Sequence, residues 1–328
     1  MADETMNKQS CDFYFDSYAH YTAHEDLLKD KYRMRSFKNA IFENKERIKG
    51  KAVLDAGTGT GIFAMWAAQA GARVVYAVEQ SSIAEYAEKI VKLNGFSAVI
   101  KIIHGKLEEV ELPEKVDFII CDYMGSCLLF DSMIPSLIVA RDRFLKEDGI
   151  ILPSESRLIF TGIEDSEYRS EKIGFWDNVY GFKFSAMKKV ALVEPLIESC
   201  PTRGILAKDC LFKTFDMKTI KKEDLSFNAP FELLPDQDNI MHSFVIWFDV
   251  FFNCPHKTIR FTTSPYHDET CYYQTICYLN DPIEVHSNVP IKGSISMKPN
   301  KDNERNEDVK IEFDSNGKHY SQYYLLKI

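Results

Sequence analysis

Three glycines stand within five residues in the stretch VLDAGTGTGIFAMWAA, between an apolar run and a helix-like segment. Gly57, Gly59 and Gly61 have no Cβ, so a ligand could approach the backbone closely there. Glu79 ends the next apolar run, 18 residues after Gly61, near the roughly 20 residues expected for a carboxylate that binds ribose hydroxyls. This pattern predicts a nucleoside-cofactor site, and a turn with a purely structural use is the alternative.

The form of the turn narrows the choice of nucleoside. GTGTG lacks the additional residue of GxGxxG, whose spacing suits a pyrophosphate, and no GK[ST] follows to hold a triphosphate. S-adenosylmethionine has ribose and adenine but no phosphate, so it fits this turn better. Glu108, in GKLEEVELP, could accept a hydrogen bond from the adenine amino group, and a solvated helix cap is the alternative for this residue.

Two further carboxylates lie on one loop, in VDFIICDYMGSCLLFDSM. Asp122 directly follows an apolar run, and Asp131 comes nine residues later. Open α/β sheets bind ligands beyond the carboxyl ends of their strands, and two carboxylates can hold a planar guanidinium in a fixed orientation. Methylation of an arginine, which stays protonated, requires such positioning and charge stabilisation. Solvent-facing acids are the alternative interpretation.

The surrounding elements change character twice along the chain. Residues 1–49 are a polar lead followed by helical periodicity. From Lys51 to Pro153, short β-branched runs alternate with helical stretches, which predicts a doubly wound parallel sheet. The remainder favours antiparallel strands. Within it, the aromatic-rich residues 168–184 predict an exposed arm or an internal loop, and the polar residues 298–308 predict a solvated loop or linker.

Composition excludes several classes of protein. Of 328 residues, 45% are apolar and 27% charged, which fits about two globular domains and argues against disorder or a membrane protein. The polar start has no secretory apolar region, so we expect an intracellular protein. Eight cysteines without a CxxC pair argue against a disulfide framework and a metal site. The net charge of −9 argues against nucleic-acid binding and suits a cationic substrate.

The whole set of motifs resembles the protein arginine methyltransferases, most closely the type I members that form asymmetric dimethylarginine. The resemblance rests on YFDSYAHY, HEDLLKD, VLDAGTGTGIFAMWAA, VEQSS, GKLEEVELP, DYMGSCLLFDSM, FWDNVYGF and TSP...YYQT. It implies an α/β plus β fold. Residues 1–49 would form a helical cofactor lid, 50–153 a Rossmann-type S-adenosylmethionine-dependent methyltransferase domain, and 154–328 a β-barrel with a helical dimerisation arm at about 166–190.

The resemblance also implies roles for individual residues. The residues that would surround S-adenosylmethionine are Tyr14, Phe15 and Tyr18 as its cover, His24 and Arg33 at its polar groups, Gly57, Gly59 and Gly61 as its back wall, Glu79 at the ribose, and Leu107 and Glu108 at the adenine. Asp122 and Asp131 would be the catalytic pair that holds the substrate arginine. Implied partners are arginine-containing proteins, such as RNA-binding proteins and histones, and a second or a related subunit. The implied location is cytoplasm and nucleus.

Seven positions depart from the family pattern on the arginine side: Leu27, Asp122, Tyr123, Ser126, Asp131, Cys271 and Tyr272. Asp122 and Asp131 stand where the family has glutamate, so each carboxylate is shorter by up to roughly 1.5 Å. Cys271 replaces a histidine, and we expect Asp30 to lose that partner.

Two hypotheses follow from these departures. The chain is a divergent but active arginine methyltransferase, or it is a prozyme-like paralogue that supports an active subunit. A third possibility, methylation of small molecules on the same core, is disfavoured by the barrel and arm motifs.

Overall fold

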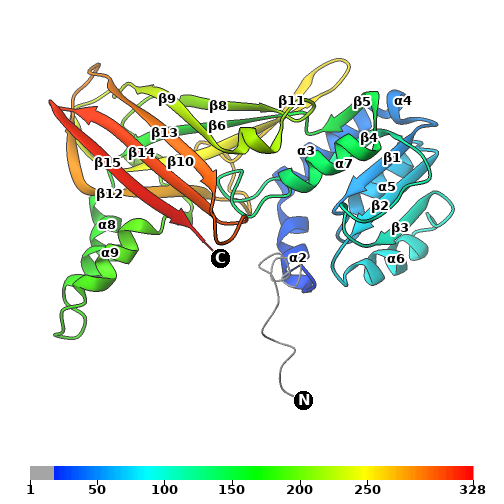
Figure 1. The fold of residues 1–328 in the computed structure, drawn as a ribbon, viewed down its shortest axis with the longest axis horizontal. Coiled ribbons are helices and arrows are strands. Elements are labelled where there is room, and N and C mark those ends of the chain that lie inside the picture. The colour runs from blue at the N-terminus through cyan, green and yellow to red at the C-terminus, as the bar shows by residue number, and fades with distance from the viewer. Residues whose placement is uncertain (1–17, 328) are drawn as a thin grey trace.

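The computed structural model describes residues 18–327, so Tyr14 and Phe15 lie outside the described residues. In this span no helix is long and apolar enough to cross a membrane. The molecule has two parts side by side, one built on a parallel sheet and one on antiparallel sheets (Figure 1). The parallel sheet ends at Leu152 and the antiparallel part begins at Glu155.

Three helices precede the parallel sheet in the described residues, and α3 lies between the two parts and contacts both (Figure 1). They are α2 (Tyr21–Lys29), α3 (Lys31–Glu43) and α4 (Lys45–Ile48). Asp30 separates α2 from α3 and accepts a hydrogen bond from the Arg33 N–H, so it caps α3. The fully buried Phe37 ring of α3 stacks on Phe63, with ring centroids 4.4 Å apart, and meets the edge of Phe252 at 5.0 Å. This helix therefore joins the parallel sheet layer to the antiparallel part.

The parallel sheet has the strand order β3-β2-β1-β4-β5. Its strands are β1 (Ala52–Ala56), β2 (Val74–Glu79), β3 (Ile100–His104), β4 (Val116–Cys121) and β5 (Leu145–Leu152). The helices that follow them are α5 (Ile62–Gln69), α6 (Ala84–Leu93) and α7 (Ile134–Phe144). Every residue of β1 and β2 is buried, as expected for parallel strands covered on both faces. The predicted alternation of strand and helix is confirmed.

The antiparallel part consists of two sheets with the orders β7-β12-β10-β6-β8 and β15-β14-β13-β9, and β11 pairs with β10. Its strands are β6 (Glu155–Ile163), β7 (Leu196–Glu198), β8 (Cys210–Asp216), β9 (Phe227–Leu233), β10 (Asn239–Asn253), β11 (Thr258–Thr262), β12 (Gln274–Val285), β13 (Ile291–Pro299), β14 (Glu307–Ser315) and β15 (Lys318–Leu326). The short 3-10 helices η2 (Thr202–Gly204) and η3 (Lys222–Leu225) connect strands. Phe160, Phe231, Phe244 and Phe313 pack edge to face or tilted in the core between the sheets.

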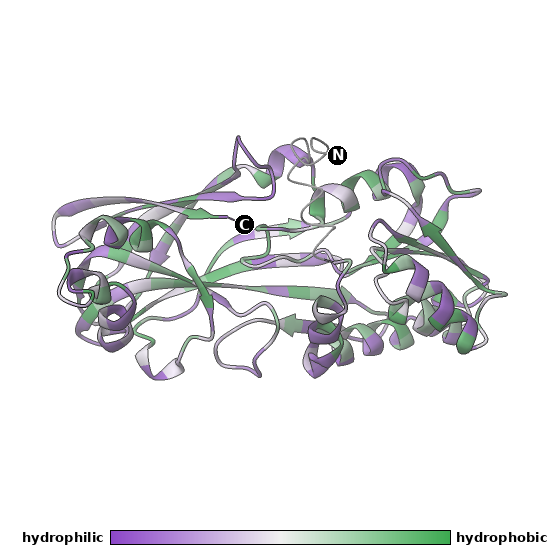
Figure 2. Ribbon diagram, turned by 90° about the horizontal axis from the view of Figure 1, so that it is seen from below, coloured by the Kyte–Doolittle hydropathy of each residue, from purple (hydrophilic) through white to green (hydrophobic). Residues whose placement is uncertain are grey.

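The hydropathy of the chain follows this layering. Long strands in the middle of both parts are coloured mainly as hydrophobic in Figure 2, and many of the connecting loops are coloured as hydrophilic. The predicted barrel-like second half is confirmed.

The aromatic-rich segment forms an arm that projects from the antiparallel part (Figure 1). It contains α8 (Ser166–Lys172), η1 (Gly174–Asp177) and α9 (Ser185–Val193). Its mixed charges fit no single helix, because short helices separated by a turn share the segment. Tyr180 at the tip is 96% exposed and Phe182 is 71% exposed. An internal loop, the alternative prediction, is therefore wrong.

The prediction of a solvated loop at residues 298–308 is only partly correct. The β13–β14 hairpin turns within this segment, and β14 begins at Glu307. Because a strand alternates its faces, Glu307 falls on the same buried face as Val309 and Ile311. The composition is polar, but the register of the hairpin directs this acid inward.

Candidate active site

One cavity brings most of the predicted site residues together, at the carboxyl ends of the parallel strands. Its empty volume, open mouth included, is about 950 Å³, and small-molecule sites are typically concave and lined by apolar side chains with a few polar groups. The predicted residues that line it are Tyr18, His24, Arg33, Gly57, Gly59, Glu79, Leu107, Glu108 and Asp122. Gly61 and Asp131 are not among its lining residues.

The glycine turn leaves β1 and enters α5 at the floor of the cavity. Gly59 has a φ of +55°, and a Cβ there would lie 3.0 Å from Nδ1 of His24, so a side chain would collide with the lid. Gly61 is the N-cap residue of α5, and its left-handed φ of +89° suits a residue without a Cβ. A Cβ on Gly61 would face Val91 of α6. Gly61 therefore supports the turn from behind and does not line the cavity.

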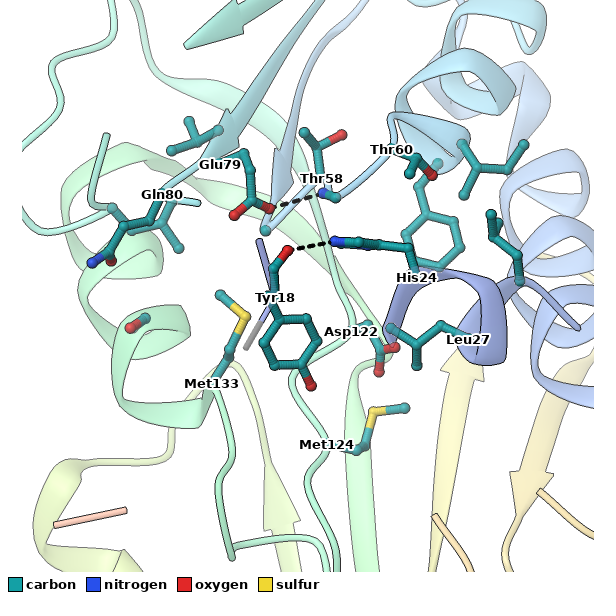
Figure 3. A pocket seen from close by; sticks show the side chains of 18 of the residues that line it. Tyr18, His24, Leu27, Thr58, Thr60, Glu79, Gln80, Asp122, Met124 and Met133 are labelled. Atoms are coloured by element: carbon teal, nitrogen blue, oxygen red, sulfur yellow. Dashed lines mark hydrogen bonds between the residues drawn. The ribbon is translucent and has the colours of Figure 1, made fainter. Parts of the chain in front are cut away.

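Glu79 at the end of β2 fixes the shape of this turn. Its Oε2 accepts a hydrogen bond of 2.9 Å from the Gly59 N–H, and its Oε1 accepts one of 2.8 Å from the Ser81 N–H. Figure 3 shows Glu79 beside the turn on the cavity wall. Each carboxylate oxygen has two acceptor sites, so each retains one for a ligand hydroxyl.

The lid contacts the glycine turn and Ser81 beside Glu79. The buried His24 ring in α2 bonds through Nε2 to the Tyr18 carbonyl at 2.7 Å. The Ser81 hydroxyl donates to the same carbonyl at 3.2 Å. In Figure 3 the Tyr18 ring stands between Met133 and Asp122, so the start of the described chain forms one wall of the cavity.

Leu107 and Glu108 line the end of the cavity beyond β3. Ser136, in the first turn of α7, donates a 2.7 Å hydrogen bond to the Glu108 carboxylate. The Arg143 guanidinium donates to the carbonyls of Leu107 and Glu108 and so fixes this loop. The arrangement leaves one acidic side chain and one buried apolar side chain beside each other, as the resemblance implies for an adenine site.

Asp122 lies just beyond β4 and is held from two sides. Arg33 donates from Nε to Oδ2 at 2.7 Å and forms a second, very short contact from Nη2 to the same oxygen. The Tyr272 hydroxyl donates to Oδ1 at 2.6 Å. Arg33 also lies over the rings of Phe37 and Phe63. Burial lowers the pKa of Arg33, but the charge and hydrogen bond of Asp122, together with Tyr272 and Cys271, raise it and hold the pKa above its ordinary value.

Asp131 is separated from this arrangement. Its backbone is left-handed, with a φ of +56°, and its N–H donates to the Arg305 carbonyl at 2.9 Å. Its Oδ1 lies 3.7 Å from Nη1 of Arg305 and has no hydrogen-bond partner among residues 18–327. Burial raises the pKa of Asp131 to about 6. The β13–β14 hairpin thus keeps this acid off the cavity lining, and the two aspartates do not meet in one pocket.

Only some of the seven positions that depart from the family pattern face the cavity. Leu27, Asp122 and Tyr272 line it, whereas Tyr123, Ser126 and Cys271 do not. The fully buried Tyr123 directs its hydroxyl to Ser156, at 2.8 Å, so its expected place in the pocket is wrong.

Asp30 lacks the histidine partner, as expected, but both of its carboxylate oxygens accept hydrogen bonds from backbone N–H groups. Its Oδ1 accepts from the Arg33 N–H at 2.8 Å and its Oδ2 from the Cys271 N–H at 3.0 Å. A backbone donor thus substitutes for the missing imidazole.

Several lining residues were absent from the sequence prediction. They are Leu28, Thr58, Thr60, Ile62, Phe63, Val78, Gln80, Gly105, Met124, Met133 and Ser136. Most are immediate neighbours of the predicted residues in the same motifs, so proximity in sequence could have found them. Over the described residues, no group of three or more His, Cys, Asp or Glu side chains is arranged to hold a metal ion.

The parallel part is a Rossmann-type methyltransferase core. It has a glycine turn after β1, an acid at the end of β2 and a cavity at the carboxyl edge of the sheet, and an antiparallel, barrel-like part follows it. Residues 40–155 match the family model for ribosomal protein L11 methyltransferase, and residues 154–318 match the model for the arginine methyltransferase oligomerization subdomain. The chain belongs to the protein arginine N-methyltransferase family.

Individual relatives agree with this assignment. The chain is 45% identical to protein arginine N-methyltransferase 1.1 of Arabidopsis thaliana, over 99% of this chain and 85% of that one. It is 43% identical to protein arginine N-methyltransferase 1 of Schizosaccharomyces pombe, over 93% and 90%. Among solved structures, a chain of the Trypanosoma brucei PRMT1 enzyme–prozyme heterotetrameric complex with AdoHcy superposes with a TM-score of 0.93 at 38% identity, over 95% of this chain and 100% of that one.

Proposed function

We propose that this protein transfers methyl groups from S-adenosylmethionine to the guanidinium nitrogens of arginine residues in proteins, with asymmetric dimethylarginine as the product. One observation carries the proposal. Asp122, an acid already in contact with a guanidinium group, lines the same cavity as the glycine turn and Glu79. A site of this kind can hold a nucleoside and an arginine side chain next to each other.

The residues of the cavity fit S-adenosylmethionine. Glu79 retains acceptor sites for ribose hydroxyls, and Glu108 and Leu107 can receive the adenine. Arg33 supplies a buried positive charge that suits a carboxylate. The bound group would supply a methyl on a positively charged sulfur, next to the acid of β4.

Asp122 would hold the guanidinium of the substrate and stabilise its charge while one nitrogen takes the methyl group, the sulfur–methyl bond of the donor breaks to leave a neutral thioether, and the nitrogen releases a proton to solvent. Asp131, which does not line the cavity and lies near Arg305, would add negative charge at longer range. The net charge of −9 suits basic protein segments. We therefore propose RNA-binding proteins and histones as substrates, in cytoplasm and nucleus.

The test is methyl transfer by the purified full chain to a peptide rich in arginine and glycine, followed by mass spectrometry of the product arginine. Asp122→Asn keeps the size of the side chain and removes the charge, so we expect at least a ~10²-fold fall in kcat/KM. Asp302→Asn, on the exposed hairpin, is the matched control and should leave kcat/KM unchanged. Equal activity of Asp122→Asn and wild type would refute the role of Asp122.

A second function is favoured by the position of Asp131 and by the structural relative from an enzyme–prozyme complex. The chain would then act as a regulatory subunit that binds and activates a related arginine methyltransferase. In that case the isolated chain binds cofactor without methyl transfer, and activity arises when the related subunit is added. Homodimer formation with activity of the chain alone would exclude this function.

A further inference from the structure

Tyr272 contacts Asp122 directly and is itself firmly held. It lies two residues before β12 and is 7% exposed. Its ring meets the rings of Phe248 and Phe261 edge-on, with centroids 5.4 and 6.1 Å away. Its hydroxyl donates to Oδ1 of Asp122 at 2.6 Å, on the cavity wall. The antiparallel part therefore presents a rigid donor to an acid of the parallel part.

The acceptor sites of Asp122 are unequally used. Arg33 donates twice to Oδ2, from Nε and Nη2. Tyr272 donates once to Oδ1. Since each carboxylate oxygen accepts about two hydrogen bonds, Oδ2 is filled and Oδ1 retains one acceptor site. A guanidinium that enters the cavity would find this remaining site on Oδ1.

The orientation of that remaining site depends on Tyr272. A carboxylate rotates about the bond that carries it, and Arg33 alone contacts only one of its oxygens. The hydroxyl on Oδ1 is the second contact that fixes the plane. Reacting groups need placement within roughly 0.5 Å, so a loosely held acid would bind the substrate arginine less productively.

We propose that Tyr272 is a positioning residue that fixes the Asp122 carboxylate and thereby aims the remaining acceptor site of Oδ1 at the substrate guanidinium. This inference rests on the proposed function, because it assumes that Asp122 binds the arginine. In this view Asp122 and Tyr272 act together in binding the substrate arginine. The reach that aspartate lacks is offset by a donor that holds it in one orientation.

The test removes only the hydroxyl, with Tyr272→Phe. We expect kcat/KM for an arginine peptide to fall by at least ~10-fold, because the acid is no longer held. The dissociation constant for S-adenosylhomocysteine should change less than about 2-fold, since the glycine turn, Glu79 and Arg33 stay in place. Tyr278→Phe is the matched control, because it removes a Tyr–Asp hydrogen bond of 2.5 Å, to Asp165, and neither of these residues lines the cavity. It should leave kcat/KM unchanged.

Coupling to Asp122 is measured without turnover. Binding of the arginine peptide to protein saturated with S-adenosylhomocysteine is compared, by calorimetry, for wild type, Tyr272→Phe, Asp122→Asn and the double variant. If Tyr272 acts through Asp122, Tyr272→Phe weakens binding in the wild-type background by about 10-fold and by less than about 2-fold in the Asp122→Asn background.

Two results overturn the inference in different ways. Equal losses in both backgrounds, or no loss from Tyr272→Phe in an active wild-type protein, refute the positioning role and leave the proposed function intact. A wild-type protein that neither binds nor methylates an arginine peptide refutes the proposed function, and the inference falls with it.

Discussion

Asp131 is a carboxyl group whose burial changes its acid strength. Burial raises the pKa of Asp131 to about 6, and the Arg305 charge opposes part of that rise. If the ionised form supports activity, kcat/KM should increase as pH rises through about 6 and level off above it. A pH profile of kcat/KM for the wild-type chain, from about pH 5 to about pH 9, measures this rise, which is the acid limb of the profile.

Arg305→Gln tests whether the acid limb of the pH profile reports the ionisation of Asp131. Removal of the positive charge leaves burial unopposed, so the pKa of Asp131 should rise and the limb should move to higher pH. Lys301→Gln, an exposed cation on the same hairpin, is the control and should leave the limb in place. A limb that stays fixed in Arg305→Gln would assign it to another group.

Glu307 is a buried acid outside the proposed chemistry. It is 2% exposed, and its Oε1 has no hydrogen-bond partner in the described part of the chain. Burial raises the pKa of Glu307 to about 9 from an ordinary value of 4.5. The folded state therefore prefers the neutral form. The resulting loss of stability should be absent below about pH 4.5, grow through the window from 4.5 to 9, and then level off.

Glu307→Gln replaces the titratable carboxyl group with a neutral amide of nearly the same size. Near pH 8 the variant should be more stable than wild type by roughly 1–3 kcal/mol, and the difference should vanish near pH 4.5. Urea unfolding at the two pH values measures it. Glu304→Gln, at an exposed position nearby, should change stability by less than about 0.5 kcal/mol. A pH-independent difference for Glu307→Gln would contradict the assignment.

At the scale of elements, the loop between β4 and α7 has a closed conformation. Gly125 and Leu128 exchange two backbone hydrogen bonds of 3.0 Å. A Cβ on Gly125 would lie 1.9 Å from the Phe130 carbonyl oxygen. Gly125→Ala should therefore open the loop, lower the melting temperature and reduce kcat/KM by at least ~10-fold. Gly174→Ala in the arm, where a Cβ would meet only the Ser170 side chain, is the control for scanning fluorimetry and kinetics. Unchanged kinetics in Gly125→Ala would show that the loop conformation is unimportant.

The elements themselves could be predicted from sequence to a large extent, but the loop geometry could not. The alternation of apolar runs is local, so the five parallel strands and the place of Asp122 beyond β4 follow from it. Asp131 lies on the same loop, yet its position is set by Arg305, which is far along the chain. Tyr272 likewise meets Asp122 across 150 residues. A pattern read along the chain carries no information on such pairs.

At the scale of the whole molecule, the arm offers exposed aromatic side chains, and the family model that matches this half is an oligomerization subdomain. We therefore expect a dimer or heteromer. Tyr180→Asp with Phe182→Asp should place charges in that interface and reduce the mass measured by light scattering toward one chain. Tyr323→Asp, at an exposed aromatic of β15, is the control and should leave the mass unchanged. A wild-type chain that is already monomeric would contradict the prediction.

Helix α3 packs against both halves of the molecule and couples the position of one half to that of the other. Arg33 reaches the acid of the cavity, and Phe37, about one turn later, is packed between Phe63 and Phe252. A displacement of the end of β10 that carries Phe252 would tilt this helix and withdraw the cation from Asp122. Substitutions at barrel residues that pack on α3, such as Phe252, should therefore change the affinity for the cofactor.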